Sequence, residues 1–531
     1  MSLGRSSAMI AAGTLASRVT GLLRSLVLVT TLGATGHAAD AFTTANQLPN
    51  YVFQVISTGV LTAVLVPQIV KWSQADDGGQ RLISKLFTLG TVVLLAVTAV
   101  SMVAAPLLVS AFSDFPEPAQ YDLAVAFAYW CLPQVFFYGM FALIGETLNA
   151  RRVFAPYAWA PITNNIVSIA GFCLFMWLFG SEQNAIEGWD PLKIAVIAGT
   201  ATLGILSQTV TLAVFWRKTG LKIRPDFGWR GIGLGEIKNL AGWSVGMLLV
   251  GLVVSSVQQH VITTASGDDA SSTIWFNSWL VFMLPYSLIV MSIGTPYFTQ
   301  LSEHAAAGRH EDVRSDIGQS MRVLGLLVVI ASATVLAAAI PLARVFANSP
   351  ATAGAMSPVL SAFVAALVPM AALFILQRTF YAYGDTRTPF FFTVFQAVLA
   401  ICGALVARAL LDTELLTAGV ALAQSISSAL QLVVAWVLLR RRIGSLGFAR
   451  TAISYVRFII AAIPAGAVGY GIYVLAGGID GWMTASKLAG FGGCLVIGAV
   501  AVVIYAVALA VLRSPELKAF TGQIRRRLKR A

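Results

Sequence analysis

Apolar stretches of about 20 residues or more recur along nearly the whole chain, separated by short polar segments. A stretch of that length crosses the hydrocarbon core of a bilayer as an α-helix. The approximate limits are 7–32, 40–71, 86–112, 121–149, 154–180, 193–216, 238–265, 272–302, 318–346, 354–382, 389–411, 415–439, 454–476 and 487–512. The pattern therefore predicts an all-α polytopic membrane protein with fourteen transmembrane helices.

Composition supports a membrane protein and argues against an enzyme. Of the 531 residues, 57% are hydrophobic and 11% are charged, whereas soluble domains carry roughly 25% charge. The longest polar segment between spans, 217–238, is too short for a domain core. No Walker-type phosphate loop is present, and the four cysteines lie in apolar spans without a C-x-x-C pair. We expect no cofactor, no metal site and no ATP hydrolysis.

Charge alternates between successive loops. One set is basic and includes Arg151, Arg152, the segment 217–238 and Arg440–Arg442; the other is short and acidic, as in Asp114 with Glu117. We call the two sides the basic face and the acidic face. By the positive-inside rule the basic face is cytoplasmic, with both termini on it. The net charge of +12 then reflects topology and contact of the basic tail with anionic membrane lipid, and does not indicate nucleic-acid binding.

Two landmarks on the basic face recur at a nearly constant offset. Pro67 and Pro296 are 229 residues apart, and Pro156 and Pro389, each in a short basic turn, are 233 apart. Helices 1–6 and 7–12 are therefore interpreted as two parallel repeats, an arrangement found in transporters. The predicted segments are an N-terminal lobe at 1–220, a C-terminal lobe at 221–440, and helices 13–14 with the tail at 441–531.

The first span contains two arginines, Arg18 and Arg24, and no other charge. Arg18 falls near mid-bilayer, where an arginine costs at least ~2.5–3.5 kcal/mol on insertion scales. Such a residue faces a water-filled cavity, a carboxylate or an anionic substrate; for Arg24, snorkelling to the interface is the alternative. The two side chains lie about 120° apart around a helix, so only a wide cavity, or a helix distorted at Gly21, exposes both.

Other polar residues in the spans leave alternatives open. Asp40, at the acidic-face end of the second span, either pairs with Arg24 or caps its own helix. Asn50 follows Pro49 and either satisfies the carbonyl that proline frees or contacts substrate. His260, at the end of S-S-V-Q-Q-H, either hydrogen-bonds between helices or titrates in a proton-coupled step.

Several motifs resemble the MurJ (MviN) family of bacterial lipid II flippases, within the superfamily of multidrug, oligosaccharidyl-lipid and polysaccharide exporters. They are S-R-V-T-G-L-L-R, L-G-A-T-G-H-A-A-D-A-F-T-T-A-N-Q-L-P-N and G-V-L-T-A-V-L-V-P near the N-terminus, then L-N-A-R-R-V-F-A-P-Y-A-W-A-P-I-T-N-N and Y-A-Y-G-D-T-R-T-P. The first two motifs are fairly specific, and the rest fit the wider superfamily. The resemblance covers the whole chain.

The resemblance implies two six-helix lobes around a V-shaped cavity, with the last two helices bordering a hydrophobic groove for a polyprenyl tail. It implies export of lipid II, the undecaprenyl-pyrophosphate-linked peptidoglycan precursor, across the bacterial cytoplasmic membrane by alternating access. The family's cavity arginines match Arg18 and Arg24, and its outer aspartate matches Asp40. Partners would be lipid II, membrane lipids and other proteins of cell-wall synthesis. We predict the substrate-binding set Arg18, Arg24, Asp40, Asn50 and Gln54.

The chain also departs from the family pattern. Gln54 and Leu280 occupy positions where many members have arginine, Thr58 replaces a glutamate, and Ser25 replaces an acidic residue. The cavity is therefore less cationic than in the family. Two alternatives follow: an exporter of another polyprenyl-linked oligosaccharide or amphiphilic drug, or a non-transporting scaffold of cell-wall synthesis.

The sequence also carries an expectation about energy coupling. Without an ATP motif, and with few carboxylates in the spans, the membrane potential acting on mobile charge is the expected drive. The coupling ion is not identified by any motif. A cysteine at Ala45, which we expect beside the cavity, would report the change of access.

Overall fold

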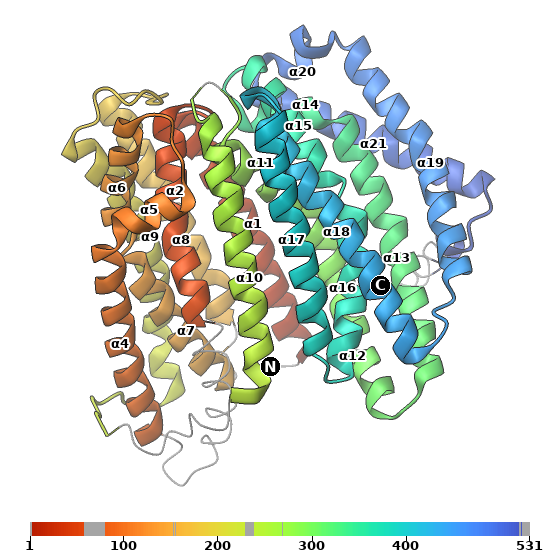
Figure 1. Ribbon diagram of the computed structural model, residues 1–531, viewed down its shortest axis with the longest axis horizontal. Helices are drawn as coiled ribbons and strands as arrows, with labels where there is room; N and C mark the ends of the chain where they lie inside the picture. The colour runs from red at the N-terminus through yellow and green to blue at the C-terminus, as the bar shows by residue number, and fades with distance from the viewer. Residues whose placement is uncertain are drawn as a thin grey trace. The chain divides into compact units, whose positions relative to one another are not determined.

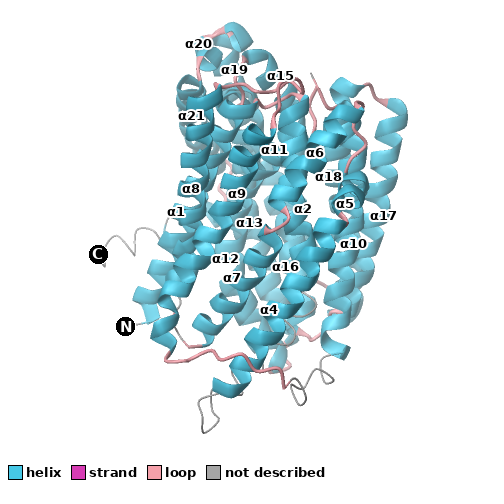
Figure 2. Cartoon of the chain, turned by 90° about the vertical axis from the view of Figure 1, so that its left-hand side faces the viewer, coloured by secondary structure: helices cyan, strands magenta, loops and turns pink. Residues whose placement is uncertain are grey.

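The computed structural model describes residues 3–57, 80–151, 153, 155–228, 238–267, 269–519 and 522. Over these ranges the chain is helical and contains no β-strand, as Figure 2 shows. Thirteen helical segments of the described chain are long and apolar enough to cross a membrane. The predicted all-α polytopic class is therefore confirmed.

Thirteen of the fourteen predicted spans coincide with these segments. The remaining one, predicted at 40–71, is described only as far as residue 57, where helix α2 occupies His37–Ile56. Residues 58–79, which include Thr58 and Pro67, lie outside the described chain. The count of fourteen stays a prediction.

Contacts divide the chain into two compact units, Met1–Thr273 and Ile274–Ala531, which we describe separately. The segments 1–220, 221–440 and 441–531 stay predictions. The helices of unit 1 (Figure 1) are α1 Leu3–Leu32, α2 His37–Ile56, α4 Gln80–Val103, α5 Ala105–Phe112, α6 Pro118–Cys131, α7 Gln134–Ala150, α8 Ala155–Phe179, α9 Pro191–Val214 and α10 Lys238–Ile262. The 3-10 turns η2 Phe215–Thr219 and η4 Thr263–Ala265 follow α9 and α10.

Helix α11, Ser272–Pro285, begins at the end of unit 1 and continues into unit 2. The further helices of unit 2 are α12 Ser292–Ala306, α13 His310–Ala337, α14 Ala339–Phe346, α15 Pro350–Val364, α16 Leu367–Ala382, α17 Arg387–Leu410, α18 Thr413–Ile443, α19 Phe448–Leu475, α20 Trp482–Ala485 and α21 Lys487–Val511. A π-helical segment, Tyr286–Met291, joins α11 to α12. It follows Pro285, whose missing N–H group interrupts the regular helical ladder.

The same helix breaks occur in both units. In unit 1 the third span breaks at Ala104 and the fourth at Leu132–Pro133; in unit 2 the corresponding spans break at Ala338 and at Ala365–Ala366, 233–234 residues later. Proline follows or occupies each break and fits the first turn of the new helix, where its missing N–H has no partner to lose. The recurrence supports the repeat inferred from the sequence.

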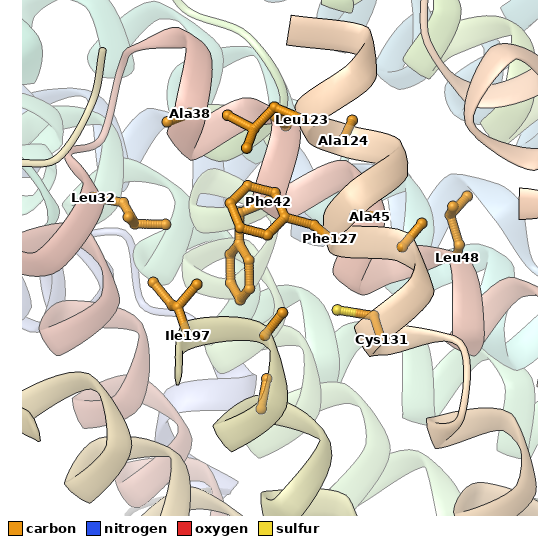
Figure 3. Packing of buried hydrophobic residues seen from close by; sticks show 14 of the residues in the cluster. Leu32, Ala38, Phe42, Ala45, Leu48, Leu123, Ala124, Phe127, Cys131 and Ile197 are labelled. Carbon is orange, nitrogen blue, oxygen red and sulfur yellow. The ribbon is translucent and has the colours of Figure 1, made fainter. Parts of the chain in front are cut away.

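An apolar cluster fixes α2 within unit 1 (Figure 3). Phe42 is fully buried and makes edge-to-face contacts with Phe127 of α6 and Phe172 of α8, at centroid distances of 5.5 and 6.5 Å. Ala45 is also fully buried in this cluster. The expectation that Ala45 borders a cavity is therefore wrong, because its small side chain allows α2 to pack closely.

In unit 2, the helices α13, α19 and α21 pack against one another, and the Tyr505 hydroxyl of α21 donates to the Leu326 carbonyl oxygen of α13 at 3.0 Å. Helix α13 begins at His310, eight residues before the span predicted from residue 318. Its first two turns carry Glu311 and Asp312, which favour a helix N-terminus but are polar, so an apolar window does not include them. This helix therefore continues beyond the apolar span at the basic face.

Candidate functional site

The arginine-bearing helix α1 runs without a break from Leu3 to Leu32 and packs on α8. The side-chain amide of Asn165 in α8 donates to the carbonyl oxygen of Ser17 at 3.1 Å and to the hydroxyl of Thr20 at 2.9 Å. These bonds attach α1 to α8 directly before Gly21, and α1 remains a regular helix at this glycine. The alternative of a helix distorted at Gly21 is therefore excluded, and the two arginines keep their helical separation of about 9 Å along the axis.

Arg18 and Arg24 are both half-buried. Arg24 lies close to Tyr138 of α7, and the Tyr138 ring stacks on Phe53 of α2 at a centroid distance of 5.6 Å. In the part of the chain that the structure describes, neither guanidinium has a carboxylate partner. Two membrane-helix cations without counter-ions are able to receive an anion, because guanidinium groups bind phosphate oxygens bidentately.

Asn50 and Gln54 lie one turn apart on α2, and both side chains are half-buried. Neither side chain hydrogen-bonds to a described residue. Of the two alternatives for Asn50, the bond to the carbonyl that Pro49 frees is therefore not formed in this part of the chain, and contact with substrate stays a prediction. Gln54 is the neighbour of Phe53, which contacts Tyr138. It is Phe53, and not Gln54, that the described contacts connect to the surroundings of Arg24.

Asp40 binds neither of the partners that the sequence suggested. Its side chain is 1% exposed; Oδ2 accepts from the Ser266 hydroxyl at 2.7 Å and Oδ1 from the backbone N–H of Thr273 at 2.8 Å. Thr273 lies in the first turn of α11, so Asp40 caps α11 and not its own helix. We call Asp40, Ser266 and Thr273 the acidic-face latch.

A polar network surrounds this latch. The Gln120 amide donates to the Ser266 hydroxyl at 2.6 Å and to the His37 carbonyl oxygen at 2.8 Å, connecting α6 and α2 to the segment between α10 and α11. His260 is half-exposed and lies 3.6 Å from Asp114, in an ion pair if protonated. Asp114 belongs to the connection between α5 and α6, so this contact does not decide between the two alternatives for His260, which stay predictions.

Sequence reasoning missed Ser266, Thr273, Gln120 and Tyr138. Ser266 lies in the polar run S-G-D-D-A-S-S-T, in the part that the span count treats as a loop, and Thr273 ends this run in the first turn of the span predicted at 272–302. A useful signal is the concentration of hydroxyl residues directly before an apolar span, because such residues are typical of helix N-termini. Tyr138 has no comparable signal, since aromatic residues are common in membrane helices.

A second aspartate, Asp385, lies at the basic face of unit 2, in the turn between α16 and α17. It accepts from the Thr388 backbone N–H and hydroxyl at 2.9 and 2.8 Å and forms an ion pair with Arg442 at the end of α18. Partial burial alone raises the pKa of Asp385, but the bonds from Thr388 and the charge of Arg442 outweigh it and hold the pKa below its ordinary value. In the described ranges, no three His, Cys, Asp or Glu side chains are grouped to hold a metal ion.

Unit 2 contains an apolar groove of about 570 Å³ between α13, α16 and α19. Its lining includes Val329 and Leu336 of α13, Val368 of α16, and Ile463 and Tyr470 of α19. The resemblance implied that both of the last two helices border such a groove. Of these two helices, α19 lines the groove, and its described lining contains no residue of α21.

Known structures share this fold. A structure titled "Lipid II flippase MurJ, inward closed conformation" superposes with a TM-score of 0.73 at 16% identity, over 95% of this chain and 99% of that one. An inward-facing multidrug resistance MATE family transporter of the MOP superfamily superposes with a TM-score of 0.65 at 15% identity, over 81% of this chain and 95% of that one. The chain therefore shares the polytopic helical fold of these structures.

The particular family follows from sequence comparison. The family model for "Lipid II flippase MurJ" matches residues 28–489. A relative named "Probable lipid II flippase MurJ" from Haemophilus influenzae is 28% identical over 403 residues, which cover 71% of this chain and 75% of the relative. The chain belongs to the MurJ family of lipid II flippases and is an integral membrane protein.

Proposed function

We propose that this chain transports lipid II across the bacterial cytoplasmic membrane by alternating access. Membership of the MurJ family supports lipid II as the substrate. The observation that carries the proposal is that α1 has two half-buried arginines without a described carboxylate partner. The diphosphate of lipid II is an anion, and a guanidinium in low dielectric binds phosphate oxygens strongly. Arg18 and Arg24 are the proposed diphosphate ligands.

Asn50 and Gln54 are proposed to contact the polar sugar and peptide of the substrate. Both amides are half-buried and have no hydrogen-bond partner among described residues, so binding a polar group would satisfy donors and acceptors that are otherwise available. At position 54, where many family members have arginine, Gln54 would bind the substrate through neutral hydrogen bonds and not through charge. The groove of unit 2, whose lining is almost entirely apolar, is suited to a polyprenyl chain.

Asp40 is proposed to act on access and not on the diphosphate. Its carboxylate is fully buried and already accepts bonds from Ser266 and Thr273, which leaves no exposed oxygen for an anion that it would repel. The acidic-face latch holds α2 to the start of α11. In this proposal the latch opens once in each export cycle, and the basic face is cytoplasmic.

Reconstituted vesicles test the proposal. Full-length protein is placed in liposomes with fluorescently labelled lipid II, and the labelled fraction that crosses is measured with and without a membrane potential. Arg18→Ala and Arg24→Ala should each slow movement by about tenfold or more, because each removes a charge-assisted phosphate contact worth ~1.5–3 kcal/mol. Arg408→Ala, at an exposed position at the end of α17, is the matched control and should transport normally.

Three outcomes would contradict the proposal. Normal transport by both α1 variants would exclude the arginines as diphosphate ligands. Movement of another polyprenyl-linked oligosaccharide but not of lipid II would indicate a different exporter, and no movement of any lipid by folded protein would indicate a scaffold. Dependence on sodium and not on potential would contradict the expected coupling.

A further inference from the structure

A second cavity, of about 480 Å³, opens at the basic face of unit 2, where α18 ends and α19 begins. Its lining consists of Trp436, Arg440, Ser445, Leu446, Gly447, Ala449 and Arg450. It contains two arginines, one from each helix, and no acidic residue. The volume lies in the range of small-ligand sites.

The cavity is shaped by the four-residue connection Gly444–Gly447. Gly444 and Gly447 have φ values of +83° and +64°, in the left-handed region that side chains rarely adopt, so the chain reverses within a short distance. Between them, Leu446 is only 6% exposed and anchors the connection in the protein. The two arginines are thereby held on either side of a fixed turn.

Arg440 and Arg450 are exposed, and neither forms an ion pair with a described residue. The two nearby carboxylates already have other partners. Asp385 binds Arg442, and Glu516 binds Arg322 and accepts from Ser454. The cavity therefore keeps two uncompensated positive charges, which a phosphate group matches in geometry and sign.

The position of the cavity favours a lipid over a soluble phosphate. Arg440 lies in the last turn of a membrane span that ends at Ile443, and Trp436 lies one turn further into the span, where tryptophan is enriched at membrane interfaces. Exposed apolar side chains continue from the cavity along both helices: Val433 and Val437 on α18, and Ile453 and Val456 on α19. A phosphate at the arginines would thus have an apolar path for its acyl chains.

We propose that this cavity binds the phosphodiester headgroup of an anionic membrane phospholipid, of the phosphatidylglycerol type. Arg440 and Arg450 contact the phosphate oxygens, and the acyl chains lie along α18 and α19. Such a lipid would fasten the α18–α19 connection at the basic face. The site involves none of the residues proposed to bind lipid II, so its binding readout is independent of transport.

Native mass spectrometry of the detergent-purified full chain tests the proposal. Dioleoyl phosphatidylglycerol is titrated against dioleoyl phosphatidylcholine, and bound lipid is counted for each. Arg440→Gln and Arg450→Gln should each weaken phosphatidylglycerol binding by about tenfold, and Arg440→Lys should recover part of it, since charge remains without the planar fork. Arg441→Gln, an exposed neighbour outside the cavity, is the matched control and should change binding less than twofold. Each variant is first checked for the parental unfolding temperature.

Four results would overturn the proposal. Equal weakening by Arg441→Gln would show non-specific attraction to a basic surface, and equal binding of phosphatidylcholine would remove the role of net headgroup charge. Displacement of the lipid by millimolar inorganic phosphate would indicate an ion site. Loss of lipid II binding in Arg440→Gln, with phosphatidylglycerol binding intact, would assign the cavity to the transported substrate.

Discussion

Asp40 and Asp385 have contrasting environments. Asp40 is fully buried at the acidic face, and its partners are a hydroxyl and a backbone N–H, without a cation. Asp385, at the basic face, has a partly exposed side chain and combines bonds from Thr388 with an ion pair to Arg442. The first residue joins segments 233 residues apart, whereas the second joins neighbouring helices.

The difference shows how the same side chain serves two purposes. A buried carboxylate that depends on a few neutral donors is sensitive to the loss of any one of them, because the remaining groups are left without partners away from water. A partly exposed ion pair loses little when broken, since water solvates both charges. The latch at Asp40 is therefore suited to open and close completely, and the contact at Asp385 to fasten a turn.

Among the single substitutions that compare the two aspartates, Asp40→Asn is expected to cause the largest loss of local stability. The amide keeps one acceptor but turns its NH₂ group toward the Ser266 hydroxyl or the Thr273 N–H, so one charge-assisted bond worth ~1.5–3 kcal/mol is lost. Hydrogen exchange at the Thr273 amide should accelerate by about tenfold or more. Mass-spectrometric exchange of peptides covering 263–273 measures it.

The matched control for that change is Asp122→Asn, at an exposed position on α6. Exchange at Thr273 should be unaffected in this variant. An unchanged rate in Asp40→Asn as well would mean that the latch contributes nothing to the start of α11, and the contrast with Asp385 would disappear.

Asp385→Asn is expected to lower the stability of the fold by a smaller amount, and this loss depends on pH. Because the folded-state pKa lies below the ordinary 3.8, the carboxylate contributes stability that is present above pH 3.8 and is lost as the pH falls through the lower, folded-state value. For a partly exposed pair this amounts to about 1 kcal/mol or less. Unfolding temperatures of the parent and of Asp385→Asn, measured from pH 6 to pH 3, should converge only at the acidic end. A constant difference across the range would contradict the assignment.

The smallest effect is expected for Arg309→Gln. Arg309 lies 3.6 Å from Asp312 with both side chains about half-exposed, and its charge stands unfavourably at the N-terminus of α13. Loss of the pair and relief of the dipole should nearly cancel, leaving a change under about 0.5 kcal/mol. Arg309→Gln is compared directly with Asp385→Asn at pH 6: an equally large shift in unfolding temperature would show that greater exposure does not make the Arg309–Asp312 pair weaker than the Asp385–Arg442 pair.

The sequence predicts the helical architecture well because span length and apolar content are local properties. The positions of Arg18 and Arg24 in a membrane helix follow directly from such reading. Helix interruptions at Ala104 and Ala338 do not, because alanine favours helix and the break arises where a new helix with an early proline starts. The burial of Phe42 likewise depends on Phe127, a residue 85 positions away.

The latch could be predicted only in part. Charge near a helix start marks Asp40 as a capping residue, but the helix that it caps is set by tertiary structure, since Thr273 lies 233 residues further on. No periodicity links these two positions. Similarly, the unpaired charges of Arg440 and Arg450 emerge only after neighbouring carboxylates are seen to have other partners.

The contact between α1 and α8 bears on how the protein is made. Helix α1 contains two arginines and is poorly suited to remain in lipid by itself. The amide that holds it, on Asn165, is synthesised 148 residues after Ser17. Stable insertion of α1 therefore has to wait for α8, and until then the nascent helix requires shelter in the translocation machinery or beside an assisting insertase. Biogenesis of this protein is thus coupled to the order in which its helices emerge.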